Sequence, residues 1–132
     1  MRMFRKEKLA RDKIVKCMED MGAQVYWRSL NEQEYTIALR KKLCEEALEV
    51  TDAKTREELL EELADVYEVI DALKMTHGLI EEEIRLTQAQ KREKKGGFFE
   101  RIYIEKTAYP QGSYWEKHCL ASPEKYPEII EE

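Results

Sequence analysis

Apolar side chains recur every three or four positions through most of the first 95 residues, and charged side chains fill many of the positions between them. This spacing is close to the period of an α-helix and predicts amphipathic helices, each with one apolar side. Short polar or glycine-containing stretches interrupt the pattern and divide it into four segments. We therefore expect helices over residues 4–22, 31–54, 55–77 and 79–95.

Two of the predicted helix starts carry capping residues. Asn31 is followed three residues later by Glu34, and Thr55 is followed in the same way by Glu58. In a capping box of this kind, the two side chains accept hydrogen bonds from backbone N–H groups at the helix start. Gly78 suits the left-handed conformation that often follows the last residue of a helix. These signals predict a tight connection between the second and third helices and an end to the third.

The pattern changes after Gly96 and Gly97. Residues 98–106 alternate enough between apolar and polar side chains to predict a short strand. Residues 107–132 contain all three prolines and show no clear period, so we expect an irregular C-terminal arm. Its aromatic residues favour packing on the body or on a second subunit. The predicted organisation is an all-α domain over residues 1–106, followed by the arm over 107–132.

Composition narrows the class of protein. The chain has 132 residues, enough for one domain with a core, and its net charge of -5 argues against binding a nucleic acid polymer. No stretch approaches the ~20 apolar residues that span a bilayer, and the first residues lack the apolar run of a signal peptide. The three cysteines stand in unrelated contexts and indicate free thiols. We expect a cytoplasmic protein with no membrane partner.

Two pairs of acidic residues are the main candidates for chemistry. Glu46 and Glu49 lie three positions apart, and so do Glu62 and Asp65. On a helix this spacing places both carboxylates of a pair on one side, one turn apart. Two facing helices would then form an all-oxygen site that suits a hard cation such as Mg2+. The alternative is an ordinary solvated acidic face, because 28 residues of the chain are Asp or Glu.

The helical wheel separates these pairs from other acidic residues. The predicted buried side of the second helix consists of Leu39, Leu43, Ala47 and Val50. That of the third helix consists of Leu59, Leu63, Val66, Ile70 and Leu73. Glu46 borders the first of these sides, and Glu62 and Asp65 flank the second, whereas Glu61 and Glu68 point toward solvent. The two pairs are therefore expected to face one another beside a shared helix interface.

Basic residues form a second candidate feature. The end of the fourth predicted helix contains Lys91, Arg92, Lys94 and Lys95, directly before the two glycines. Glycines let a backbone approach a ligand closely, so this segment could bind phosphate. The alternative is a plain helix end, where cations and glycine are both favoured. Arg11 and Lys13 are open to the same kind of alternative, as phosphate ligands or as part of a surface helix turn.

The order of these motifs resembles the signature of the all-α NTP pyrophosphatase superfamily. Glu45, Glu46 and Glu49 match its EExxE motif. After a short connection, Glu62 and Asp65 match its ExxD motif. The KLARDKI start and the KREKKGGF run are similar to the branch with MazG-like proteins and phosphoribosyl-ATP pyrophosphohydrolases. The resemblance covers residues 6–104, and the arm from residue 107 onward lies outside it.

The resemblance implies a four-helix core in a homodimer or homotetramer. It also implies cleavage of a nucleoside triphosphate between its α and β phosphates with Mg2+, for which Mn2+ would be a substitute. The implied metal ligands are Glu46, Glu49, Glu62 and Asp65. The implied proton acceptor for the attacking water is Glu45 or Glu49. The implied phosphate ligands are Arg11, Lys13, Lys91, Arg92, Lys94 and Lys95.

Three functions stay open at this point. Hydrolysis of non-standard or excess nucleoside triphosphates is the one that the motifs favour. Hydrolysis of phosphoribosyl-ATP would use the same chemistry, although the irregular arm does not belong to that enzyme's pattern. A non-catalytic helical interaction module would keep the fold without turnover, although all four carboxylate positions are filled here.

Overall fold

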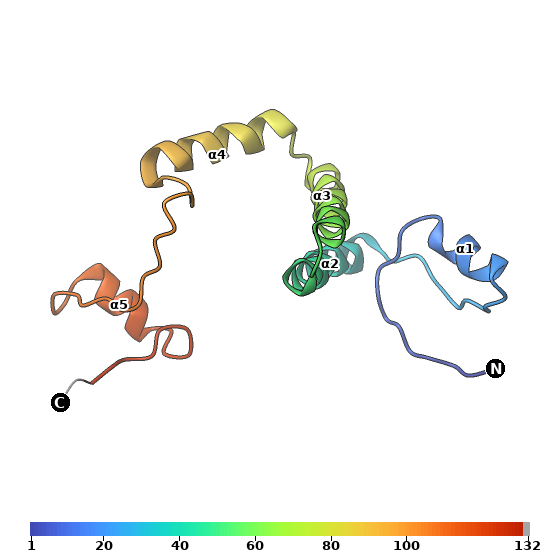
Figure 1. Ribbon diagram of the computed structural model, residues 1–132, viewed down its shortest axis with the longest axis horizontal. Helices are drawn as coiled ribbons and strands as arrows, with labels where there is room; N and C mark the ends of the chain where they lie inside the picture. Colours follow the sequence, from blue (N-terminus) through green and yellow to red (C-terminus); the bar gives the residue numbers. More distant parts are fainter. Residues whose placement is uncertain (131–132) are drawn as a thin grey trace. The chain divides into compact units, whose positions relative to one another are not determined.

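The computed structural model of the chain describes residues 1–130. All regular secondary structure in that range is helical, and the range contains no strand. Its helices, drawn in Figure 1, are α1 (Ile14–Asp20), α2 (Glu32–Asp52), α3 (Arg56–His77), α4 (Glu81–Lys95) and α5 (Tyr114–Leu120). The chain forms two compact units, Met1–Lys94 and a second that begins at Lys95. The functional division expected between residues 106 and 107 stays a prediction. None of the described helices is both long and apolar enough to cross a lipid bilayer.

The centre of the first unit is a hairpin of α2 and α3, which lie side by side (Figure 1). The predicted capping box at Asn31 is confirmed: the Asn31 side chain accepts a hydrogen bond from the Glu34 N–H at 2.9 Å, and Glu34 accepts one from the Asn31 N–H. At Thr55 only half of the predicted box forms: Thr55 accepts from the Glu58 N–H at 3.1 Å, whereas the Glu58 carboxylate accepts from the Lys54 N–H at 2.8 Å. α3 begins at Arg56, four residues after Asp52. Gly78 ends α3 in the left-handed conformation at φ 64°.

The interface of the hairpin is turned slightly from the predicted one. Leu39 and Val69 are the buried apolar residues among those described, and Val69 lies outside the predicted set. Leu63 is 42% exposed, because α3 meets α2 along the side that carries Val69 and, seven residues earlier, Glu62. In α2, Ala47 is exposed and Glu46 lies in line with Leu39. Compared with the predicted interface, this rotation places the carboxylates of Glu46 and Glu62 within the interface and not at its border.

The helix predicted over residues 4–22 is wrong in its first half. Only α1 forms there, and Glu7 adopts a φ of 45°, which no α-helix accommodates. Met1, Met3 and Phe4 are 96%, 82% and 74% exposed, so these three apolar residues find no surface on which a helix could bury them. A short helix without such packing is marginal in water. Residues 1–11 are accordingly non-helical.

The strand predicted over residues 98–106 is also wrong. The segment contains no strand, and Arg101 interrupts it with a φ of 61°. Ile102 and Ile104 are 77% and 72% exposed. A strand needs a neighbour to satisfy its backbone groups, and alternation of side chains alone does not supply one. The pattern indicated a suitable sequence, but the described chain provides no partner.

The expected irregular arm contains a helix, α5. Ser113 caps it by accepting from the Glu116 N–H at 3.3 Å, while the Glu116 carboxylate accepts from the Gly112 N–H at 3.0 Å. Aromatic rings then gather around the helix: the Trp115 ring lies 5.2 Å from that of Tyr114 and 5.6 Å from that of His118. Ring packing therefore orders a segment whose sequence shows no long apolar period.

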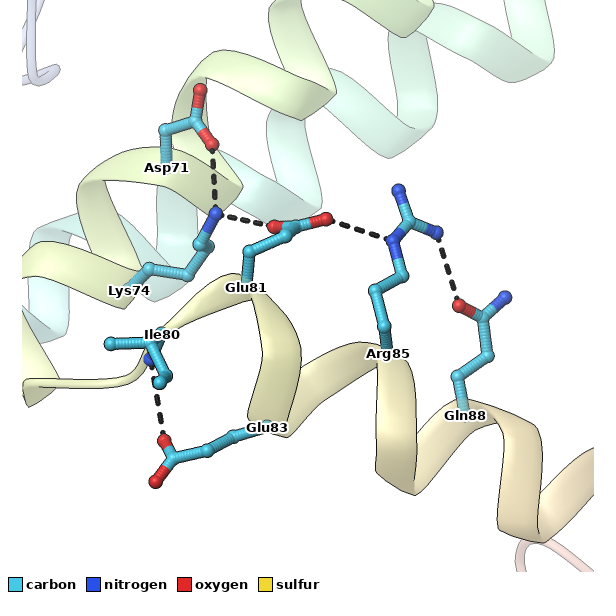
Figure 2. A network of polar contacts seen from close by, with 7 residues as sticks. All are labelled: Asp71, Lys74, Ile80, Glu81, Glu83, Arg85 and Gln88. Carbon is cyan, nitrogen blue, oxygen red and sulfur yellow. Dashed lines mark hydrogen bonds and ion pairs between the residues drawn. The ribbon is translucent and has the colours of Figure 1, made fainter.

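A polar network connects the end of α3 to the start of α4. Figure 2 shows the Glu81 carboxylate between two cations, Lys74 of α3 and Arg85 of α4. Glu81 lies 2.5 Å from Lys74 Nζ and 2.8 Å from Arg85 Nε, and Asp71 lies 3.5 Å from the same ammonium group. Because several charges share the arrangement, it fixes the start of α4 more firmly than a single surface ion pair would.

Candidate metal centre

Three carboxylates from the two helices of the hairpin converge. One oxygen atom each of Glu46, Glu62 and Asp65 lies within 4.8 Å of the other two. All three residues are half-buried, and the Glu46 side chain is only 13% exposed. Glu46 is brought there by α2, while Glu62 and Asp65 lie one turn apart on α3. The structure therefore brings together three of the four carboxylates for which the sequence predicted a metal site.

Glu49 lies beside this group without belonging to it. The residue is exposed, one turn further along α2 than Glu46. Its negative charge nevertheless contributes to raising the pKa of Glu62. Rotation by ~60° between positions three apart on a helix turns Glu49 from the interface toward solvent. A side chain at this place is available to water.

Two cations contact the carboxylates. Arg11 Nη2 lies 2.5 Å from Asp65 Oδ1, and it comes from the non-helical N-terminal segment. Lys42 Nζ lies 3.7 Å from a Glu46 oxygen and 3.1 Å from a Glu45 oxygen. Arg11 was among the predicted phosphate ligands, whereas Lys42 was not predicted as a site residue. Its position four residues before Glu46, on the same side of the helix, was the available signal.

Of the three converging carboxylates, Glu62 alone makes no ion pair with any of the described residues. Partial burial raises the pKa of Glu62, and the charges of Glu49, Asp65, Glu46 and Glu61 raise it further, in that order. A raised pKa means that the folded protein disfavours the negative charge of this group. A cation bound among the three carboxylates would remove that penalty.

The remaining predicted site residues lie elsewhere. Lys13 directly precedes α1 and makes no capping hydrogen bond with its side chain. Lys91, Arg92 and Lys94 occupy the last turns of α4, and Lys95 ends that helix and begins the second unit. Within residues 1–130, no ion pair joins Lys91 or Lys94 to Glu46, Glu62 or Asp65. The structure thus brings Arg11 to the carboxylates but not these lysines of α4.

The donor set fits a hard divalent cation. Oxygen atoms around Mg2+ lie at ~2.1 Å from the ion, so neighbouring ligands of one octahedron are ~3.0 Å apart and opposite ligands ~4.2 Å apart. The three carboxylate oxygens lie within 4.8 Å of one another, so the side chains would move toward a shared ion to reach that geometry. Three carboxylates leave further octahedral positions for water and for phosphate oxygens. Glu46, Glu62 and Asp65 are therefore the residues that could hold the ion.

Comparisons with known proteins add no relative. No family of known sequences matches the chain, and no curated protein or solved structure matches it.

Proposed function

We propose that this protein is a Mg2+-dependent nucleoside triphosphate pyrophosphohydrolase that clears non-standard or excess nucleotides. The observation that carries the proposal is the convergence of Glu46, Glu62 and Asp65 from two facing helices. These are positions of the EExxE and ExxD motifs, in the order that the resemblance requires. Arg11 adds a guanidinium group at the edge of the same cluster, where it suits a phosphate.

Different residues would bind the metal ion and the phosphate groups and accept the proton of the attacking water. Glu46, Glu62 and Asp65 would hold Mg2+, with Glu49 available as a fourth ligand. The bound ion would neutralise the triphosphate and polarise the α-phosphorus. Arg11 would exchange Asp65 for a phosphate oxygen and so orient the nucleotide.

The bond changes follow from in-line attack. A water oxygen forms a bond to the α-phosphorus while the bond from that phosphorus to the α–β bridging oxygen breaks. Pyrophosphate leaves with the electron pair, and the nucleoside monophosphate remains. The proton of the water passes to Glu45 or Glu49, whichever of the two is not engaged as a ligand. Glu45 lies 3.1 Å from Lys42, which holds its carboxylate beside the cluster.

A second copy of the chain would complete the expected four-helix core. Among the described residues, α2 and α3 are the helices that pack along each other at length. On α3, Leu60 and Tyr67 are 63% and 60% exposed, one on each side of the partly exposed Leu63. Two such hairpins would bury these side chains against each other in a homodimer, or in a homotetramer of such pairs.

The test is a panel of NTPs and dNTPs, with phosphoribosyl-ATP included, incubated with the protein and Mg2+. We expect pyrophosphate rather than orthophosphate, and loss of its release in Asp65→Ala and Glu49→Ala. Glu68→Ala is the matched control, because Glu68 is exposed on α3 away from the cluster. Turnover of phosphoribosyl-ATP alone would assign the protein to histidine synthesis instead. No release from any substrate, with no heat of Mg2+ binding, would support the non-catalytic interaction module.

A further inference from the structure

Lys42 is a half-buried lysine whose acidic partners both belong to its own helix. Its side chain is 23% exposed, whereas that of Lys16, which pairs with Asp20 at the same spacing of four, is 80% exposed. Enclosing an ammonium group costs solvation energy, which nearby carboxylates must offset. Lys42 meets this need with two carboxylates, those of Glu45 and Glu46.

Helix stability does not explain the pair. At a spacing of four, a lysine that precedes a glutamate is the less favourable order, because both charges then oppose the helix dipole. Lys42 also lies on the side of α2 that faces α3, next to the buried Leu39, and not on the solvent face where such pairs are common. Its placement is better explained by the carboxylate cluster than by its own helix.

The distribution of charges in the cluster also indicates that Lys42 serves the carboxylates. Asp65 has Arg11, and Glu46 has Lys42, so two of the three converging carboxylates each have a cation. A divalent ion at the cluster must compete with Lys42 for Glu46. Glu45, the second partner of Lys42 at 3.1 Å, lies outside the three and would keep the ammonium group when Glu46 turns to the ion.

We propose that Lys42 is the internal counter-ion of this centre: it holds Glu46 in the metal-free protein and passes to Glu45 alone when a divalent cation binds. Lys42 is thereby a positioning residue, which sets metal affinity and holds the candidate proton acceptor Glu45. This inference rests on the proposed function, because it assumes that the three carboxylates take up Mg2+.

Removing the charge of Lys42 should strengthen Mg2+ binding but lower both the stability of the metal-free protein and its turnover. In Lys42→Met, Mg2+ no longer competes with an ammonium group and should bind about three- to tenfold more tightly. The metal-free variant should melt at a lower temperature than the wild type, because the carboxylates have lost a counter-charge. Its kcat with saturating Mg2+ should fall, because Glu45 is no longer held. A general structural defect would instead weaken metal binding together with turnover.

Calorimetric titration with Mg2+ alone and thermal unfolding without metal measure the first two effects. Lys41→Met is the matched control: Lys41 is the exposed neighbour, without an ion pair in the part of the chain that the structure describes, and its variant should retain the wild-type affinity. If Lys42→Met does not fold, as judged by circular dichroism, Lys42→Gln removes the same charge and takes its place.

The outcomes separate the two proposals. Equal Mg2+ affinity in the Lys42 and Lys41 variants would overturn the role of Lys42 while leaving the metal centre intact. Weaker Mg2+ binding in a folded Lys42 variant would overturn it as well. Absence of Mg2+ binding by the wild-type protein would overturn the metal centre and, with it, the function proposed above.

Discussion

Arg11 Nη2 lies 2.5 Å from Asp65 Oδ1 and connects two segments that are 54 positions apart in the chain. Both side chains are partly exposed, at 55% and 37%. In solvent such a pair contributes little to stability, since water and salt screen it. The main effect of the pair is on position, because it holds the guanidinium group of a non-helical segment at the edge of three converging carboxylates. An arginine held there can move from a carboxylate to a phosphate with little change of place.

Replacing Arg11 should therefore affect nucleotide binding more than folding. We expect Arg11→Gln to raise KM for the nucleoside triphosphate about tenfold with a smaller effect on kcat, as loss of one charge-assisted contact to phosphate predicts. Steady-state kinetics at saturating Mg2+ measure both constants. Arg5→Gln is the control, since Arg5 pairs locally with Glu7 and both are exposed. An unchanged KM in the Arg11 variant would remove Arg11 from the set of phosphate ligands.

The raised pKa of Glu62 predicts a conflict between stability and metal binding. Burial and the neighbouring carboxylates raise that pKa, so ionised Glu62 destabilises the metal-free fold. Glu62→Gln should raise Tm at neutral pH in the absence of metal and lose the further rise that Mg2+ gives the wild type. Glu68→Gln, at an exposed position of the same helix, should show neither effect. Thermal unfolding with EDTA and with excess Mg2+ measures both.

The sign of the pH dependence follows from the same shift. Because the folded pKa of Glu62 lies above its unfolded value, its protonated form is favoured by folding. The stabilisation is fully present below the unfolded pKa and is lost as the pH rises through the folded pKa. The Tm advantage of Glu62→Gln should accordingly grow from acid to neutral pH. A constant difference between variant and wild type across that range would contradict the assignment.

Local signals predicted the helical hairpin well. The caps at Asn31 and Thr55 and the left-handed Gly78 act within four residues, so the sequence contains everything that they need. The same kind of signal, Ser113 followed by Glu116, precedes α5, although the prolines around it favour an irregular segment. The helix over residues 4–22 failed for the opposite reason, because its first half depends on a packing surface that the described structure does not provide.

The candidate site was predictable as far as backbone geometry determines it. Spacing placed Glu62 and Asp65 on one side of α3 and Glu46 near the interface, which the structure bears out. Whether Glu49 joins them depends on the rotation of α2 against α3, and in this structure the buried residues of the two helices are Leu39 and Val69. The pairing of Arg11 with Asp65 depends on a loop path across 54 positions, and no local pattern encodes such a path.

The network at the start of α4 predicts a local loss of protection when Glu81 is changed. Hydrogen bonds from Lys74 and Arg85 lower the pKa of Glu81, so its carboxylate stabilises the fold above its unfolded pKa and loses this effect as pH falls through the folded value (Figure 2). In Glu81→Gln, amide hydrogen exchange in the first turn of α4 should become faster at neutral pH. The difference from the wild type should shrink under acid conditions.

Glu82→Gln provides the comparison for that experiment. Glu82 lies in the same first turn as Glu81, but it makes no ion pair within residues 1–130. The Glu82→Gln substitution removes the same charge from the helix N-terminus. Its exchange rates should stay near those of the wild type. Equal acceleration in both variants would attribute the effect to the helix dipole and not to the contacts with Lys74 and Arg85.

If the proposed homodimer forms, we expect a second copy to bind at the exposed apolar side of α3. Leu60 is 63% exposed, so Leu60→Lys should change the stability of an isolated chain by only about 0.5 kcal/mol. In a dimer through this side the same lysine would be buried without a partner and would prevent association. Sedimentation velocity over a concentration series should show the wild-type assembly dissociating in Leu60→Lys. Met75→Lys is the control, at a residue 87% exposed near the end of the same helix, and should leave the assembly intact. An assembly that survives Leu60→Lys would locate the interface elsewhere on the chain, and the four-helix core would then need a different pair of helices to complete it.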